Sequence, residues 1–85
     1  MEIIFKDKAL ADIEFWKKSG NVQIQKKISE LIADTLKHHE TGMGKPEKLK
    51  HQLSGLWSRR INNEHRMIYT VADGVLYIAS LKGHY

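Results

Sequence analysis

The residues best suited to chemistry lie between Gly44 and Arg66, where the positive charge of the chain is concentrated. This segment holds six Lys or Arg residues and two Glu residues, a net charge of +4, which equals that of the whole 85-residue chain. Positive charge gathered on one surface suits a protein that binds phosphate groups or an acidic partner. A solvated basic face is the alternative that charge alone leaves open. The cations are Lys45, Lys48, Lys50, Arg59, Arg60 and Arg66.

The strand-like run within this segment separates its two arginines. Successive residues of a strand point to opposite faces. Trp57, Arg59 and Ile61 therefore share one face. Ser58 and Arg60 share the other. The two arginines are expected to have different surroundings.

The histidines give weaker signals when each is taken alone. His38 and His39 end a helical stretch, and adjacent helical residues point about 100° apart. The pair is therefore not expected to chelate one ion, and neither a metal nor a cofactor is predicted. The terminal pair His84 and Tyr85 would by itself be interpreted as a frayed tail.

Composition excludes several classes of protein. The chain has no Cys, so it has no disulfide, no thiolate zinc site and no Cys nucleophile, which suits a reducing cytoplasm. Its first residues lack the pattern of a signal peptide, and the longest apolar run, Val75 to Leu81, is too short to cross a bilayer. We expect one domain over residues 1–85, in solution, with a core small enough to benefit from a partner.

Two helices are predicted in the first half of the chain. The first runs from about Lys8 to Lys18, with Asp7 as its N-cap. Gly20 ends it, and Asn21 caps a second helix. Apolar residues recur at helical spacing in both: Leu10, Ile13 and Trp16 in the first, and Ile24, Ile28, Leu31, Ile32 and Leu36 in the second. Lys26, Lys27, Glu30, Asp34 and Lys37 lie off the second stripe and are interpreted as an exposed face.

Strand patterns dominate the second half, after a loop from Glu40 to Glu47. Asp73-Gly74 is a strong hairpin signal between the last two strands. With an opening strand at Ile3 to Phe5, the order is β-α-α-β-β-β. This order predicts an α+β domain whose mostly antiparallel sheet is covered on one face by the N-terminal helical hairpin. The other predicted strands are Leu56 to Ile61, His65 to Ala72 and Val75 to Lys82.

The run GKPEKLKHQLSGLWSRRINNEHRMIYTV and the terminal HY together resemble the YoeB (Txe) toxins of the RelE superfamily. The resemblance is specific from Gly42 to Tyr85 and looser from Ile3 to Leu36. It implies a RelE-like fold and a small bacterial toxin of a type II toxin-antitoxin pair that enters the ribosomal A site and cuts mRNA.

The resemblance also implies roles for four residues. Metal-free RNA cleavage needs a base for the 2′-OH proton, an acid for the leaving 5′-oxygen and a cation for the charge on the phosphate. By similarity to the family, Glu47 is the base, His84 the acid and Arg66 the residue that stabilises the phosphorane. Tyr85 would orient the substrate and stack on a base. The products would be a 2′,3′-cyclic phosphate and a 5′-OH.

Other basic residues would position RNA phosphates. A free glutamate is too acidic to be an efficient base at neutral pH, so we expect Glu47 to be partly buried, against the opposing effect of the lysines. His51 is the alternative proton carrier, His65 is expected to be structural or to face RNA, and Trp57 to be a core or dimer residue rather than a base-stacking one. The residues assigned to phosphates are Lys48, Lys50, His51, Arg59 and Arg60.

The sequence departs from the family pattern at two positions, and the resemblance also implies several partners. Leu56 and Gly83 stand where family members often carry aromatic rings, so the base reader beside the tail and part of the hydrophobic surface are expected to differ. The partners implied are mRNA on the ribosome, including its 16S rRNA, a YefM/Phd-type antitoxin and a second copy of the chain. The alternative function is a non-catalytic basic module that blocks the ribosome by occupancy.

Overall fold

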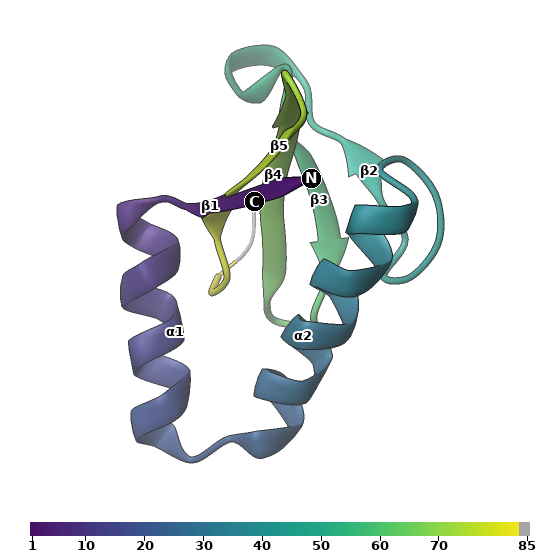
Figure 1. Ribbon diagram of the computed structural model, residues 1–85. Helices are drawn as coiled ribbons and strands as arrows, with labels where there is room; N and C mark the ends of the chain where they lie inside the picture. The colour runs from purple at the N-terminus through teal and green to yellow at the C-terminus, as the bar shows by residue number, and fades with distance from the viewer. Residues whose placement is uncertain (84–85) are drawn as a thin grey trace.

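A five-stranded sheet backed by two helices forms the computed structural model, which describes residues 1–83 (Figure 1). The strand order is β1-β5-β4-β3-β2, in which β1 is parallel to β5 and every other pairing is antiparallel. The expected mostly antiparallel α+β fold and its element order are confirmed. The strands are β1 (Glu2–Phe5), β2 (Glu47–Lys48), β3 (Trp57–Arg60), β4 (Arg66–Ala72) and β5 (Val75–Ser80).

The first helix, α1 (Asp7–Ser19), follows the predicted stripe in part: Trp16 is buried and Ile13 packs partly buried against the core, but Leu10 does not. Leu10 is 50% exposed, whereas Asp12 is only 6% exposed. Asp12 is inside because its carboxylate accepts from the Leu81 N–H at 2.8 Å and from the Lys8 ammonium at 2.7 Å. A polar residue thus occupies the inward face, which an apolar pattern does not reveal. The predicted Asp7 cap is also wrong, since Asp7 is the first helical residue.

The turn into α2 (Val22–Lys37) follows the prediction. Gly20 has a φ of +71°, the left-handed conformation that ends helices. The Asn21 side chain accepts from the Ile24 N–H at 3.1 Å and caps the second helix. Ile28 and Leu31 of the predicted stripe are buried. The helical hairpin therefore arises from local signals that the sequence carries.

The strands match the predictions except at their ends. Asp73 and Gly74 have φ values of +53° and +76°, the two positive values that a type I′ hairpin turn requires. The last strand ends at Ser80, earlier than predicted, because the Leu81 backbone bonds to α1 instead of to a strand. The two-residue β2 and a 3₁₀ turn at His51–Leu53 were not predicted, since neither is long enough to show a periodic pattern.

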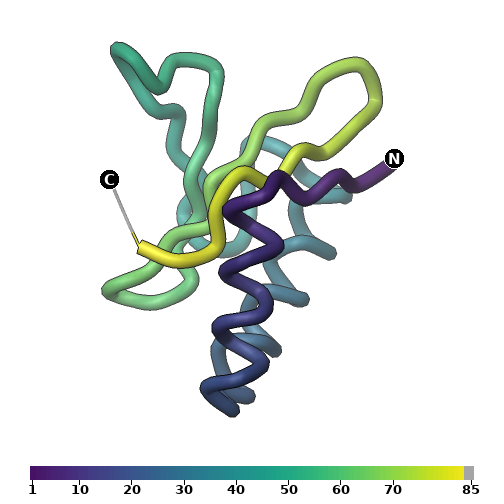
Figure 2. Tube along the Cα trace, turned by 90° about the vertical axis from the view of Figure 1, so that its left-hand side faces the viewer, coloured from purple at the N-terminus to yellow at the C-terminus, as the bar shows by residue number. Residues whose placement is uncertain are grey.

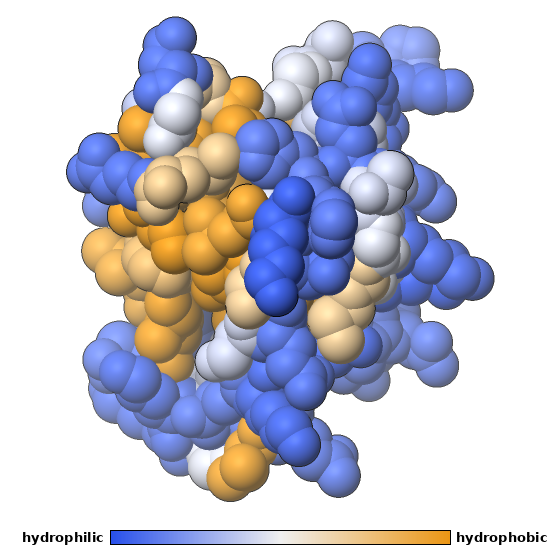
Figure 3. Space-filling model, turned by 45° about the vertical axis from the view of Figure 1, so that its right-hand side comes forward, coloured by the Kyte–Doolittle hydropathy of each residue, from blue (hydrophilic) through white to orange (hydrophobic). Residues whose placement is uncertain are grey.

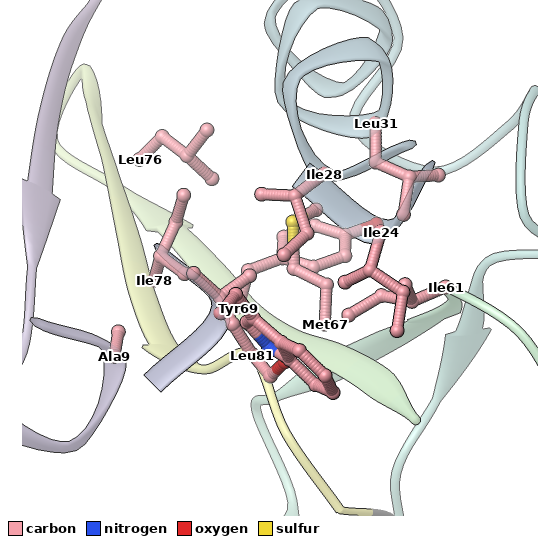
Figure 4. Close-up of a cluster of buried hydrophobic side chains, with 11 residues drawn as sticks. Ala9, Ile24, Ile28, Leu31, Ile61, Met67, Tyr69, Leu76, Ile78 and Leu81 are labelled. Carbon is pink, nitrogen blue, oxygen red and sulfur yellow. The ribbon is translucent and has the colours of Figure 1, made fainter. Parts of the chain in front are cut away.

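The core lies between the helices and one face of the sheet. Figure 4 shows Ile24, Ile28 and Leu31 of α2 above Met67 and Tyr69 of β4. Trp57 packs partly buried against this cluster, which confirms its expected place in the core. Within residues 1–83, no helix is long and apolar enough to cross a membrane.

Part of the apolar surface stays uncovered between the two helices. A groove of about 220 Å³ there is lined mainly by Phe5, Ile13, Trp16, Ile28 and Ile32. Figure 3 shows hydrophobic side chains gathered in one patch on this side of the molecule. Apolar patches beside polar surface are typical of protein contact sites.

Candidate active site

The register of β2, β3 and β4 brings Glu47 and Arg66 to the same face of the sheet. Glu47 pairs with Ser58, and Ser58 pairs with Ile68. Two residues further along the strands, Arg60 pairs with Arg66. Since side chains two residues apart share a face, all five point away from the core. The mid-chain carboxylate and the arginine of the next hairpin are thus placed together by strand pairing alone.

These side chains line a cavity of about 130 Å³. Its charged members are Glu47 and three cations, Lys45, Arg60 and Arg66. Within residues 1–83, the ion pairs are Lys8–Asp12 and Arg59–Asp34, so none of the three cations is paired with a carboxylate there. Like charges opposite each other in a sheet destabilise it, and an anion bound between them would remove the repulsion. The cavity therefore suits a phosphate group next to a carboxylate.

Arg66 is oriented by the turn that precedes it. Its Nη1 donates to the carbonyl of Asn62 at 2.7 Å and to that of His65 at 3.2 Å. Its backbone N–H donates to the Gly83 carbonyl at 2.8 Å. A half-buried guanidinium held in this way is pre-organised, which is what stabilisation of a transition-state charge requires.

A buried network under the sheet holds the loop that carries Lys45 and Glu47. Arg59 is 0% exposed, and its Nε donates to the Tyr69 hydroxyl at 3.1 Å. The Arg59 Nη1 donates to Asp34 Oδ2 at 2.7 Å. Burial of Tyr69 raises the pKa of its phenol. The remaining guanidinium bonds go to loop carbonyls, those of His38, Thr41 and Met43. All five N–H donors of the planar fork are used, so the loop is tied to β3.

The close packing continues to the edge of the site. The Gly44 carbonyl accepts from the Arg60 N–H at 2.7 Å. A Cβ at Gly44 would lie 2.8 Å from Leu31 Cδ2, and the φ of Gly44 is +81°. Only glycine fits here without strain. The backbone is therefore held in place just before Lys45 and Glu47, which line the cavity.

Comparison with known proteins identifies the chain at this point. The family model "YoeB-like toxin of bacterial type II toxin-antitoxin system" matches residues 5–85.

The chain belongs to this family.

Relatives and solved structures agree with the assignment. The toxin YoeB of Escherichia coli strain K12 is 47% identical over 85 residues, with 100% of both chains covered. A YoeB/ParE toxin from Agrobacterium tumefaciens has a TM-score of 0.96 at 34% identity, again with 100% of both chains covered. Structures of Staphylococcus aureus YoeB, solved as a YoeB-YefM complex (44% identity) and as a dimer (43%), each give a TM-score of 0.90 and cover 100% of this chain and 98% of theirs. The resemblance seen in the sequence and the RelE-like fold are confirmed.

The structure of this YoeB-family toxin contradicts one assignment to RNA phosphates. Arg59 lies on the core side of β3 and is fully buried, so it cannot contact RNA in this fold. Strand alternation had separated Arg59 from Arg60, and the separation is confirmed. Asp34, interpreted as part of an exposed face, is instead partly buried, because its carboxylate is the partner of Arg59.

The other basic residues are divided between the two faces. Arg60 lines the cavity. Lys48 pairs with Trp57 on the opposite side of β2, with its ammonium 5.9 Å from the centre of that ring. Lys50 and His51 are exposed in the loop after β2 and do not line the cavity.

Two polar cavity residues, Lys45 and Ser58, were missed, and one expectation about the site was wrong. Ser58 could have been found, because strand alternation already placed it beside Arg60, whereas Lys45 lies in an irregular loop that carries no such signal. Glu47 is exposed, so the expected partial burial is not found. His84 and Tyr85 lie outside the described residues.

Three histidines of the described chain, His38, His39 and His65, make structural contacts, whereas His51 is exposed. His38 and His39 contribute their backbone carbonyls, to Arg59 and to the Tyr69 hydroxyl. Within residues 1–83, no group of three or more His, Cys, Asp or Glu side chains could hold a metal ion. His65 accepts a hydrogen bond from the Gly83 N–H and packs on the Trp16 ring.

Acid is expected to weaken the buried network of the toxin. The N–H of Met43, at 2.9 Å, and then the guanidinium of Arg59 hold the pKa of Asp34 below its ordinary value of 3.8. A folded-state pKa below the unfolded one gives stability that is fully present above pH 3.8 and is lost as the pH falls through the lower, folded-state value. Urea unfolding at a series of acidic pH values should show a steeper loss for the parent than for Asp34→Asn. Equal slopes would contradict the prediction.

Proposed function

We propose that this toxin is a ribosome-dependent endoribonuclease that cuts mRNA in the ribosomal A site and so inhibits translation. The observation that carries the proposal is the cavity in which Glu47 and Arg66 meet with two further cations. The family to which the chain belongs supports it. The toxin would act in the cytoplasm, where its target is found.

The proposed reaction is general acid-base cleavage without a metal. Glu47 takes the proton of the 2′-OH, whose oxygen forms a bond to phosphorus. Arg66, with Lys45 and Arg60 beside it, stabilises the negative charge of the phosphorane. The bond from phosphorus to the 5′-oxygen then breaks, and His84 protonates that oxygen. A 2′,3′-cyclic phosphate and a 5′-OH remain.

Exposure of Glu47 fits a site that the substrate completes. A carboxylate in water is a weak base, but an RNA strand laid over the cavity would remove that water and strengthen the interactions beneath it. The free toxin would then be a poor nuclease. On the ribosome, the decoding site would press the mRNA backbone against the three cations, and Tyr85 would orient the base.

Two kinds of protein partner are part of the proposal. Staphylococcus aureus YoeB has been solved with YefM and as a dimer, so we infer that this toxin pairs with a YefM-type antitoxin and with itself. The uncovered groove between α1 and α2 offers apolar surface for such contacts. An acidic antitoxin segment would be attracted to Lys45, Arg60 and Arg66 of the cavity.

Product analysis tests the function directly. Ribosomes programmed with mRNA and mixed with the toxin in EDTA should yield fragments that end in a cyclic phosphate and begin with a 5′-OH. Intact mRNA with translation still blocked would favour the rival function, a basic module that acts by occupancy. Loss of cutting in EDTA would indicate a metal mechanism instead.

A further inference from the structure

The segment that follows β5 is held by side chains of α1. The Leu81 N–H donates to Asp12 Oδ2 at 2.8 Å, and the Leu81 carbonyl accepts from Trp16 Nε1 at 2.9 Å. The next carbonyl, that of Lys82, accepts from Lys8 Nζ at 3.2 Å. The three side chains are spaced four residues apart and so line one face of α1. Backbone beyond the sheet is thus fixed without a strand partner.

Gly83, the last described residue, is held by two neighbours on the other side. Its N–H donates to His65 Nδ1 at 2.9 Å, and its carbonyl accepts from the Arg66 N–H at 2.8 Å. Figure 2 shows this yellow end of the described chain beside the green turn that joins β3 and β4. Gly83, the residue before position 84, is therefore hydrogen-bonded to the backbone of Arg66, whose side chain lines the cavity.

The His65 ring is itself positioned. It stands edge-on to the Trp16 ring, with the ring centres 4.9 Å apart and the planes at 77°. Its backbone N–H donates to Asn62 Oδ1 at 2.8 Å. Because Nδ1 accepts from Gly83, the hydrogen bond assigns the proton of the neutral ring to Nε2. The imidazole is therefore a pre-oriented acceptor aimed at one backbone N–H.

We propose that His65 is a positioning residue for the catalytic tail. By fixing the Gly83 N–H beside Arg66, it limits where the following residue can place a proton donor relative to the cavity. The inference rests on the proposed function, in which His84 is the general acid. A displacement of about 1 Å of a reacting group can cost about 10²-fold in rate. Loss of the hydrogen bond between Gly83 and His65, one residue before the proposed acid, is therefore expected to lower the rate strongly.

A matched pair of variants separates the acceptor from the ring. His65→Phe keeps a ring against Trp16 and removes the acceptor, whereas His65→Asn loses the ring and keeps a side-chain oxygen close to the position of Nδ1. In His65→Phe we expect kcat for cleavage on programmed ribosomes to fall about 10- to 100-fold, with KM within about twofold, because the cavity cations stay in place. In His65→Asn we expect kcat within about threefold of the parent.

Nuclear magnetic resonance reports on the same bond without any activity. The Gly83 amide proton should shift upfield and exchange faster in His65→Phe, but stay near the parent values in His65→Asn. If His65→Phe does not fold, His65→Leu, which is close in shape to Asn, replaces it in the comparison. Unchanged Gly83 signals in the folded variant without an acceptor would overturn the proposed bond.

His84→Ala distinguishes failure of the inference from failure of the proposed function. If His84→Ala loses activity while His65→Phe keeps the parent kcat, His65 does not position the tail. If both His65 variants lose kcat equally, the acceptor is not what matters, and the inference is wrong. If His84→Ala itself cleaves at the parent rate, the catalytic role of the tail fails, whatever the result at His65.

Discussion

Glu47→Gln is expected to lower the rate of mRNA cleavage on the ribosome by about 10²- to 10⁴-fold, the usual effect of removing a positioned general base. Glutamine keeps the size of the side chain and removes its ability to take the 2′-OH proton. Because Glu47 is exposed on the edge strand, stability should not change. Single-turnover cleavage of programmed ribosomes provides the measurement. Glu30→Gln, the same change on the exposed face of α2, is the control and should leave the rate unchanged.

The same assay extends to the other proposed groups. Arg66→Lys keeps the charge but loses the planar fork that Asn62 and His65 orient, so it should also be severely impaired. His84→Ala and deletion of Tyr85 should each reduce cleavage. If Glu47→Gln cleaves at the parent rate, Glu47 is not the base, and His51 is the alternative. Parent rates in either tail variant would remove the tail from the mechanism.

Arg59→Met is expected to destabilise the fold by about 3–5 kcal/mol, because several acceptors around the fully buried guanidinium lose their donor at about 1–3 kcal/mol each. Met fills a similar volume but leaves the Asp34 carboxylate and the loop carbonyls without their donors. In a domain of this size, such a loss lowers Tm by more than about 12 °C. Guanidinium unfolding followed by circular dichroism gives the free energy of unfolding.

The adjacent arginine is the matched control for that experiment. Arg60→Met makes the same chemical change on the outer face of β3, next to Arg66. Its stability should stay within about 0.5 kcal/mol of the parent, because the residue is exposed. Equal destabilisation by both substitutions would mean that the buried network does not carry the difference.

Much of the fold was predictable because its signals are local. Gly20, Asn21 and the Asp73-Gly74 turn have conformations that depend on their own side chains and immediate neighbours. The burial of Asp12 was not predictable in this way, because its partner at Leu81 is almost the full chain away. Helical periodicity identifies an apolar stripe, but it does not identify a carboxylate that takes a buried place through a distant backbone N–H.

The candidate site was predictable to a different extent. The family motif gave Glu47 and Arg66, and pairing of β2, β3 and β4 explains why they meet. The role of Arg59 was mistaken although alternation had placed it beside Trp57 and Ile61. A charged residue in a basic segment was assigned to RNA, when its partner was an aspartate on a helix that is remote in sequence. Such an ion pair depends on how α2 packs on the sheet, which periodicity does not report.

The parallel pairing of β1 with β5 has a consequence for the biosynthesis of the toxin. Glu2 pairs with Val75, so the first strand of a nascent chain has no partner until residues 75–78 have been synthesised. Contacts of such wide sequence separation form late in folding. The sheet of a nascent chain is therefore expected to be completed only after β5 has been synthesised, so the toxin stays incompletely folded until then.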